Sequence, residues 1–510
     1  VRDYSLLEQC LRERRVGIPF FLILVASILA ISLALFHLFA AGFGTPESHS
    51  FRSTHLTVML LLAIMFKPLF RDSIRDPITI PGSPDNARRM VGFVADMVLL
   101  GLVILVETYV LYDVEEFQAR EGDISQMDMY VGALLIFLVL EATRRAVGWT
   151  MVFITLFFIL QTLYTNYFFG FLYGPPTRFI HFIDIQFVRT DGIYGIPLFV
   201  VSSYILLFIL FGGILIRSGA GRFFIDLAVS LTGHRTGGPA KAAVVASAFL
   251  GTVSGSATAN VVTTGSFTIP MMKRLGYRAK FAAAVEACAS SGGQITPPIM
   301  GAASFLMAEF LEVPYTTIVI AAIVPASMHY IGVLSIVHFT AKRLGLAGYP
   351  KDQLPKFLKI WREGWYTVMP LVALLLTLFT GYSPNMAAFM GLTFCIIVGF
   401  SSYQKPVTLI FPAAMMAYIL WRVSIDAFSP TMGGILAGLV ILSLMHKSQR
   451  HSFRALFDSF HVGVQYALAV GAACAAVGIV VGVINTTVSP FASASWSPPA
   501  PATWQMFYMR

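Results

Sequence analysis

The sequence has 510 residues, of which 57% are hydrophobic and 12% are charged, with a net charge of +9. Soluble domains carry about 25% charged residues, so this composition excludes an ordinary soluble globular protein. Nucleic-acid binding is disfavoured as the reason for the positive charge. Most basic residues stand in short loops between apolar runs, where Lys and Arg set membrane topology.

Repeated apolar runs predict an all-α polytopic membrane protein with about 13 to 14 spans, in contact with membrane lipid rather than nucleic acid. An amphipathic segment at 221–231 is typical of a helix that lies in the membrane interface. The apolar spans that can be delimited are residues 18–41, 56–70, 91–112, 130–140, 147–171, 193–216, 315–339, 365–381, 385–400, 407–421, 431–445 and 462–484.

The distribution of Lys and Arg predicts the sides of the membrane. Basic residues gather in segment 1–15, in segment 67–89 and at Arg144 and Arg145, whereas the loops between these places are poor in them. Because cytoplasmic loops carry the excess of Lys and Arg, we expect the N-terminus in the cytoplasm. The charged segment 341–364 is expected to be a cytoplasmic linker between two halves.

Residues 251–301 form a polar island, rich in Gly, Ser, Thr and Pro, within this apolar chain. Non-helical backbone at membrane depth survives only where protein covers it or water fills a cavity beside it. The island starts with too few residues for a full crossing and return, so we expect a re-entrant hairpin with its tip near 254–260. A second segment enters at 282–290, breaks at 291–298 and resumes at 299–310. Such interrupted segments point to a transporter's binding site.

Two helix breaks can bind both a cation and an anion. Freed backbone carbonyls supply hard oxygen ligands, and we expect them to bind Na⁺ near Gly255 and Gly293, with no organic cofactor. Amide groups at half-helix N-termini suit a carboxylate substrate. Close helix packing is the alternative explanation for any single small residue. The candidate substrate- or ion-binding residues are Ser254, Gly255, Ser256, Ala257, Asn260, Thr264, Ser291, Gly292, Gly293, Gln294, Thr296, Pro297 and Pro298.

Glu286 is a candidate intramembrane carboxylate, which is a functional hypothesis by default. Its alternative is a simple ion pair with Lys280, and the sequence leaves both interpretations open. A serine hydrolase is disfavoured, because GTVSG around Ser254 has the spacing G-x-x-S-G rather than G-x-S-x-G, and no histidine lies nearby in sequence. The sequence therefore predicts a protein that is not an enzyme.

Two stretches, GPAKAAVVASAFLGTVSGSATANVVTTGSFTIPMMKRLGY and AVEACASSGGQITPPIMGAASFLMAE, carry a resemblance to a known family. They resemble the large permease subunit of tripartite ATP-independent periplasmic (TRAP) transporters, and GIYGIPLFVVSSYILLFILFGGILIRSGAG fits the same pattern. More narrowly, the chain is similar to fused permeases, in which a small-subunit-like region precedes the large subunit. Such permeases are usually paired with solute-binding proteins of the TAXI type.

The resemblance implies a Na⁺-driven symporter of the bacterial inner membrane that works by an elevator-type movement. Its substrate would be an organic anion, delivered by a periplasmic TAXI-type solute-binding protein. The regions implied are a small-subunit-like scaffold (1–125), the first half of the large subunit with hairpin and broken helix (126–340), a cytoplasmic linker (341–364), the start of the second half (365–487) and a Pro-rich tail (488–510).

One departure from the family pattern concerns the second inverted repeat. Residues 471–487 resemble its start, but no second cluster rich in Gly, Ser and Pro follows, and the tail 488–510 is typical of a truncated or frameshifted product. We therefore expect an incomplete second repeat, a disordered tail and impaired transport. The alternatives are a tripartite tricarboxylate-type permease, a non-transporting membrane scaffold fragment and an intramembrane serine hydrolase.

Overall fold

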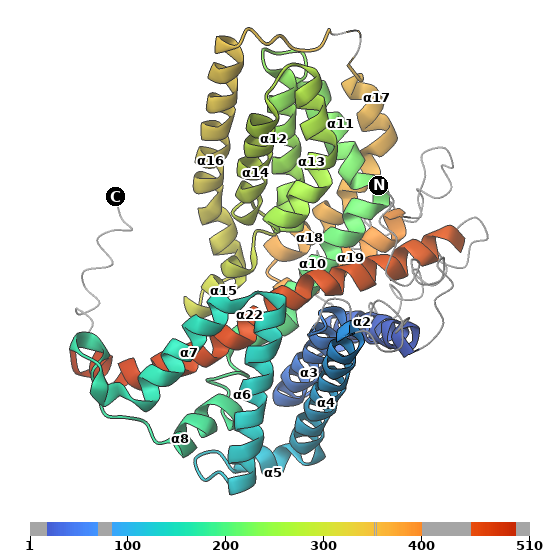
Figure 1. Cartoon of the computed structure of the whole chain (residues 1–510). Helices are drawn as coiled ribbons and strands as arrows, with labels where there is room; N and C mark the ends of the chain where they lie inside the picture. The colour runs from blue at the N-terminus through green and yellow to red at the C-terminus, as the bar shows by residue number, and fades with distance from the viewer. Residues whose placement is uncertain (1–17, 70–83, 351, 353, 400–449, 496–510) are drawn as a thin grey trace. The chain divides into compact units, whose positions relative to one another are not determined.

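The structure is a computed structural model that describes residues 18–69, 84–350, 352, 354–399 and 450–495 (Figure 1). These residues are helical and contain no β-strand, which confirms the all-α polytopic fold. The expected spans 407–421 and 431–445 lie outside the described residues. Helices in the described ranges that are long and apolar enough to cross a membrane are Phe21–Phe43, Met90–Tyr112, Gln126–Ala146, Ile196–Leu215, Tyr315–Arg343 and Asp458–Asn485.

The chain divides into two compact units. Unit 1 comprises residues 1–46 and 200–467, and unit 2 comprises 47–199 and 468–510. The predicted boundary at residue 125 therefore falls inside unit 2. The predicted tail, 488–510, begins within a helix, because α22 (Arg450–Ser495) continues past Thr487 to Ser495. Residues 496–510 lie outside the described part.

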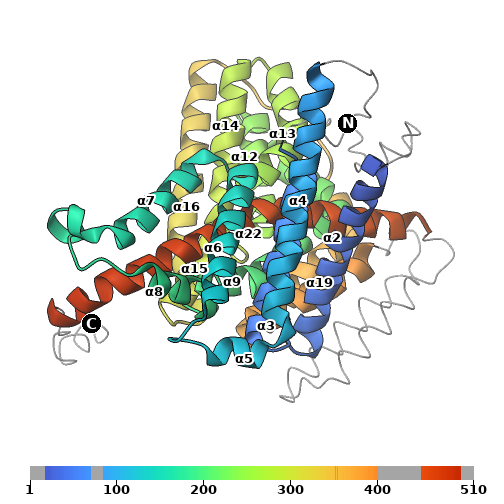
Figure 2. The same ribbon diagram turned by 60° about the horizontal axis from the view of Figure 1, so that its bottom comes forward.

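Unit 2 is built on helices that pack around one apolar core (Figure 2). Leu60, Val106 and Leu135 come from three different helices and are buried together with Phe117 and Phe187. Within a membrane, where lipid tails are as apolar as these side chains, close van der Waals packing holds such helices together. The helices of unit 2 are α3 (Ser48–Phe66), α4 (Pro84–Tyr112), α5 (Val114–Ala119), α6 (Gln126–Ala146), α7 (Trp149–Leu163) and α8 (Phe179–Ile183), with α9 (Ile196–Val200) at its end and residues 468–495 of α22.

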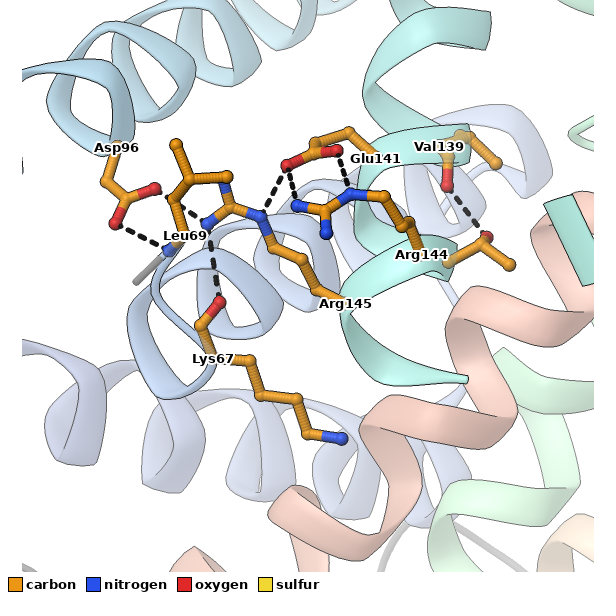
Figure 3. A network of polar contacts seen from close by, with 8 residues as sticks. Lys67, Leu69, Asp96, Val139, Glu141, Arg144 and Arg145 are labelled. Atoms are coloured by element: carbon orange, nitrogen blue, oxygen red, sulfur yellow. Dashed lines mark hydrogen bonds and ion pairs between the residues drawn. The ribbon is translucent and has the colours of Figure 1, made fainter. Parts of the chain in front are cut away.

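A buried ionic network joins α6 to α4 in unit 2 (Figure 3). Arg145 contacts Asp96 at 2.7 Å and Glu141 at 2.7 Å, and the side chains of Arg145 and Asp96 are 2% and 0% exposed. Arg144 holds Glu141 in a two-point contact, and the amide of Leu69 donates to Asp96 at 3.1 Å. Sequence analysis counted Arg144 and Arg145 only as topology residues, so this structural role was missed.

Helix α3 begins at Ser48, eight residues before the predicted span, because Glu47 caps its first turn. The Glu47 carboxylate accepts hydrogen bonds from the amides of His49 at 2.8 Å and Ser50 at 2.7 Å, and from the Gln118 side chain at 3.0 Å. Partial burial tends to raise the pKa of Glu47, but these hydrogen bonds to its charged form outweigh that effect and lower the pKa to about 2.

Changing Glu47 to glutamine is therefore expected to weaken the start of α3 by about 0.5–1 kcal/mol at neutral pH. The native pKa of Glu47 is depressed, so its stabilisation is full above its ordinary value of 4.5 and is lost as the pH falls towards 2. Hydrogen exchange of the first turn of α3 should differ between wild type and variant at pH 7 and converge in acid. A Glu115→Gln control should leave this turn unchanged, and a difference that persists in acid would contradict the capping role.

Unit 1 contains the hairpin region, formed by α12 (Gly238–Ser254), α13 (Ala257–Arg274) and α14 (Ala279–Ser291), which lie side by side with α16 in Figures 1 and 2. Phe223, Phe224 and Leu227 are buried on α11, whereas Leu231 is 42% exposed, which confirms an amphipathic helix at the predicted place. The helices of unit 1 outside the hairpin region are α2 (Ile18–Phe43), α10 (Leu206–Leu215), α11 (Gly221–Thr232), α16 (Tyr315–Arg343), α17 (Phe357–Gly364), α18 (Met369–Phe379) and α19 (Pro384–Gly399).

Candidate functional site

The predicted hairpin is present, formed by α12 (Gly238–Ser254) and α13 (Ala257–Arg274). Its turn consists of Gly255 and Ser256. Gly255 has a left-handed backbone with φ of +57°, a conformation that glycine adopts at little cost. The Ser256 hydroxyl then accepts from the amide of Ala259 at 3.3 Å and caps α13. The turn therefore lies inside the predicted tip, 254–260.

The predicted broken helix is also present, but its break is longer than expected. Helix α14 (Ala279–Ser291) ends in a 3₁₀ turn, Gly292–Gln294, and α15 starts only at Ala302 and runs to Phe310. The prediction ended the break at residue 298. Two features extend it: the consecutive prolines 297 and 298 lack amide donors, and Met300 has a positive φ of +60°. Tyr315 from α16 donates to the Ile299 carbonyl at 2.5 Å and covers this irregular backbone.

The two breaks pack directly on one another through glycine. A Cβ atom at Gly255 would lie 1.9 Å from the Met300 carbonyl oxygen, and one at Gly251 would lie 2.6 Å from the Gly293 Cα. Both distances are far below van der Waals contact, so only glycine permits this approach. The hairpin turn and the break in α14–α15 are therefore neighbours, although they are about 45 residues apart in sequence.

Glu286 of α14 is enclosed by hydroxyl groups and is completely buried. Its Oε1 accepts from Ser247 at 3.1 Å, from Ser290 at 3.3 Å and from Thr264, and its Oε2 accepts from Thr268 at 2.5 Å. These side chains come from three helices, α12, α13 and α14. We call this group of Ser247, Thr264, Thr268, Glu286 and Ser290 the hydroxyl cage.

Glu286 does not form the ion pair with Lys280, and its functional role stays a prediction. Lys280 is exposed, and the described residues include no salt bridge to Glu286. A buried carboxylate with only neutral partners is energetically costly, so it is a marker of function rather than of stability.

Asn260 connects the hydroxyl cage to the two breaks. Its Nδ2 donates to the Ser247 carbonyl at 2.9 Å, and its carbonyl oxygen lies 2.7 Å from the Thr264 hydroxyl oxygen. The Nδ2 atom also lies against Gly293, because a Cβ atom added to Gly293 would lie 3.5 Å from it. The Asn260 Oδ1 is buried and has no hydrogen-bond partner among the described residues. An acceptor left without a donor at this place is suited to a cation.

The predicted residues fall into two groups. Asn260 and Gly293 are buried where the two breaks meet, Gly292 is buried against His329 and Tyr330, and Thr264 belongs to the hydroxyl cage. Thr296 donates to the Gly292 carbonyl at 2.6 Å, close to Pro297 and Pro298. Residues that the structure leaves wholly or partly exposed are Ser254, Gly255, Ser256, Ala257, Ser291, Gln294 and Pro297.

Ser247, Thr268 and Ser290 were missed by sequence analysis, although a signal for each exists. With a turn at 255–256, residues equidistant from it pair across the hairpin, which places Ser247 opposite Thr264. Thr268 follows Thr264 by four residues, and Ser290 follows Glu286 by four, so each lies on the same helix face as its partner. A hairpin register would therefore have identified the cage.

Comparisons with known proteins agree with this geometry. Residues 134–409 match the family described as "Tripartite ATP-independent periplasmic transporter, DctM component". The chain is 28% identical over 219 residues to the C4-dicarboxylate TRAP transporter large permease protein DctM of Pseudomonas aeruginosa, covering 41% of this chain and 50% of that protein. It is 24% identical over 276 residues to the sialic acid TRAP transporter permease protein SiaT of Haemophilus influenzae, covering 54% of this chain and 41% of that protein.

These matches also separate the alternatives. The relatives are transport proteins and not enzymes, which argues against the serine hydrolase, and the matched family is the one the sequence resembles. The chain spans about half the length of the curated relatives that it matches. Since the family match covers more than half of the chain and includes both helix breaks, the chain belongs to the tripartite ATP-independent periplasmic transporter family, DctM component.

Proposed function

We propose that this chain is the membrane permease component of a Na⁺-coupled transporter that takes up an organic carboxylate. The observation that carries the proposal is the packing of two helix breaks, Gly251–Gly293 and Gly255–Met300, inside unit 1. Breaks of this kind supply carbonyl ligands for a cation and amide groups for an anion in one place. The family and the apolar helices indicate a multi-pass inner-membrane protein.

The cation would be held by backbone carbonyls near Gly255 and Gly293, with the Asn260 Oδ1 as a side-chain ligand. Na⁺ takes hard oxygen ligands, and Asn260 Oδ1 is a buried acceptor without a donor in the described part of the chain. The carboxylate would be held at the N-termini of α13 and α15. Ser256 caps the Ala259 amide of α13, and α15 has no side-chain cap, so other amide groups of these first turns are available to an anion.

The partner would be a periplasmic solute-binding protein that delivers the carboxylate, and we infer the TAXI type from the fused arrangement. In support, the family match starts at residue 134, which leaves 1–133 as a further region ahead of it. The cytoplasmic N-terminus and the elevator-type movement stay predictions. They rest on the loop charges and on the family resemblance.

Uptake into proteoliposomes tests this function. The chain is reconstituted, and a cognate solute-binding protein loaded with a radiolabelled carboxylate is added outside. Uptake is expected with an inward Na⁺ gradient and not with an equal K⁺ gradient, because only the Na⁺ gradient drives the coupled step. Omitting the binding protein is the control and should abolish uptake. Equal uptake under both gradients would refute Na⁺ coupling.

A further inference from the structure

We propose that one end of the hairpin region is a binding surface for the headgroups of anionic phospholipids. This surface, which we call the basic end, consists of residues 234–241, 273–280 and 341–344. The three segments contain eight Lys and Arg residues and no Asp or Glu. They lie at the ends of α12, α13, α14 and α16 that are opposite to the two breaks, so lipid binding here does not depend on the proposed transport function.

The three segments form one surface because these helix ends touch. The amide of Gly237, which precedes α12, donates to the carbonyl of Leu346, which follows α16, at 3.2 Å. A Cβ atom added to Gly237 would lie 2.6 Å from the Ala341 Cβ and 2.9 Å from the Tyr277 hydroxyl oxygen. One added to Gly276 would lie 3.3 Å from the Leu346 side chain. The start of α12, the turn between α13 and α14 and the end of α16 are therefore neighbours (Figure 1).

Within the described residues, no carboxylate pairs with the cations of the basic end. The ion pairs of this part of the chain involve none of its eight Lys and Arg side chains. Seven of the eight are exposed, and the eighth, Lys241, is partly buried and donates to His338 Nδ1 at 3.0 Å. Like charges that are held together repel one another, and a bound anion removes that repulsion.

Helix α16 connects the basic end to the membrane. It is long and apolar enough to cross a bilayer, and the side chains of Ile331, Ile336 and Phe339 along it are exposed, as suits contact with lipid tails. Lys342 and Arg343 follow Phe339 within one helical turn and close the helix. Lys and Arg at the end of a membrane span extend to the level of the headgroups. The basic end is therefore suited to lie where the phospholipid headgroups begin.

An anionic phospholipid matches both the charge and the apolar surface. Its phosphate is attracted by the basic side chains, and each Lys or Arg near a membrane surface strengthens that attraction about 5-fold. Its acyl chains cover the exposed apolar side chains of α16, which a soluble phosphate ion would leave bare. Phosphatidylglycerol has both properties, whereas phosphatidylcholine has the same acyl chains without a net charge, so the two lipids separate the contributions.

Binding of radiolabelled phosphatidylglycerol to the purified chain in an uncharged detergent tests the basic end. The wild type should bind it saturably and at least ~10-fold more tightly than phosphatidylcholine, with an affinity that falls as the salt concentration rises. Lys342→Gln/Arg343→Gln should weaken binding on the order of 10-fold. The matched control Arg178→Gln/Arg222→Gln removes two exposed positive charges outside the basic end and should keep the wild-type affinity.

Competition with inorganic phosphate at constant ionic strength separates a lipid surface from a site for a soluble anion. Phosphate in large excess should leave phosphatidylglycerol bound, because it cannot replace the contacts of the acyl chains. Displacement of the lipid by phosphate would overturn the proposal, as would equal affinities for the two lipids, an affinity that is independent of salt, or equal losses in the two double variants. The salt dependence and the lipid comparison use the wild type alone, so they decide the matter even if a variant does not fold.

Discussion

Replacing Gly255 by alanine is expected to weaken Na⁺ binding at least ~10-fold and to impair carboxylate uptake accordingly. Two costs combine at this position. The left-handed backbone with φ of +57° costs an L-residue about 1–2 kcal/mol. In addition, the new Cβ would lie 1.9 Å from the Met300 carbonyl oxygen, so the turn must move away from the break. Because the proposed cation ligands come from both breaks, their separation should lower the Na⁺ affinity at least ~10-fold, which corresponds to about 1.4 kcal/mol.

Gly345 provides a matched control for this substitution. It has a similar φ of +65°, but a Cβ there meets no atom within 4 Å. Gly345→Ala should therefore carry the backbone strain alone and retain Na⁺ binding, while Gly255→Ala weakens it. Equilibrium sodium binding and thermal unfolding of both purified variants measure the difference. Equal sodium affinities in the two variants would show that the contact between the turn and Met300 is not needed.

Replacing Arg145 by methionine is expected to destabilise unit 2 by about 3–5 kcal/mol, the usual effect of removing one member of a buried ion pair. The reason is that Asp96, whose side chain is 0% exposed, would keep only the Leu69 amide as a partner from this network. Hydrogen exchange of α4 and α6 should rise strongly, since the network joins these two helices. Thermal unfolding of the purified chain gives the change in stability.

Two further variants isolate the ion pair. Arg144→Met should have a smaller effect, because the Arg144 side chain is 24% exposed and contacts only Glu141 through its ion pair. The double variant Asp96→Leu/Arg145→Met removes both charges of the pair, so neither is buried without its partner. This variant should therefore be more stable than Arg145→Met. If Arg145→Met is no more harmful than Arg144→Met, the network does not determine the stability of unit 2.

The fold class and the position of the site could be predicted from the sequence because both depend on local composition. A membrane span can be recognised from its run of apolar residues alone, without knowing which helices it contacts. Gly255 and the prolines 297 and 298 disturb a helix in any surroundings. The break nevertheless reaches Gly301, because Met300 adopts a positive φ that no local preference of methionine suggests.

The contacts of the site could not be predicted, because they depend on how helices pack. Whether Glu286 meets Lys280 or a set of hydroxyls is decided by the register of α12 and α13 against α14, and a single sequence does not reveal that register. The burial of Arg145 has the same origin, since its partner Asp96 is 49 residues away. For both Glu286 and Arg145, the sequence drew attention to the charged residue but not to the residues that it contacts.

Equilibrium binding of radioactive sodium to the purified chain tests most directly whether the hairpin turn and the helix break form one cation site. Saturable binding is expected in the wild type and in Ser291→Ala, whose exposed hydroxyl contacts only its own helix. Asn260→Ala should bind at least ~10-fold more weakly, because the buried Oδ1 ligand is removed. Absence of saturable binding in the wild type, or unchanged affinity in Asn260→Ala, would contradict the site.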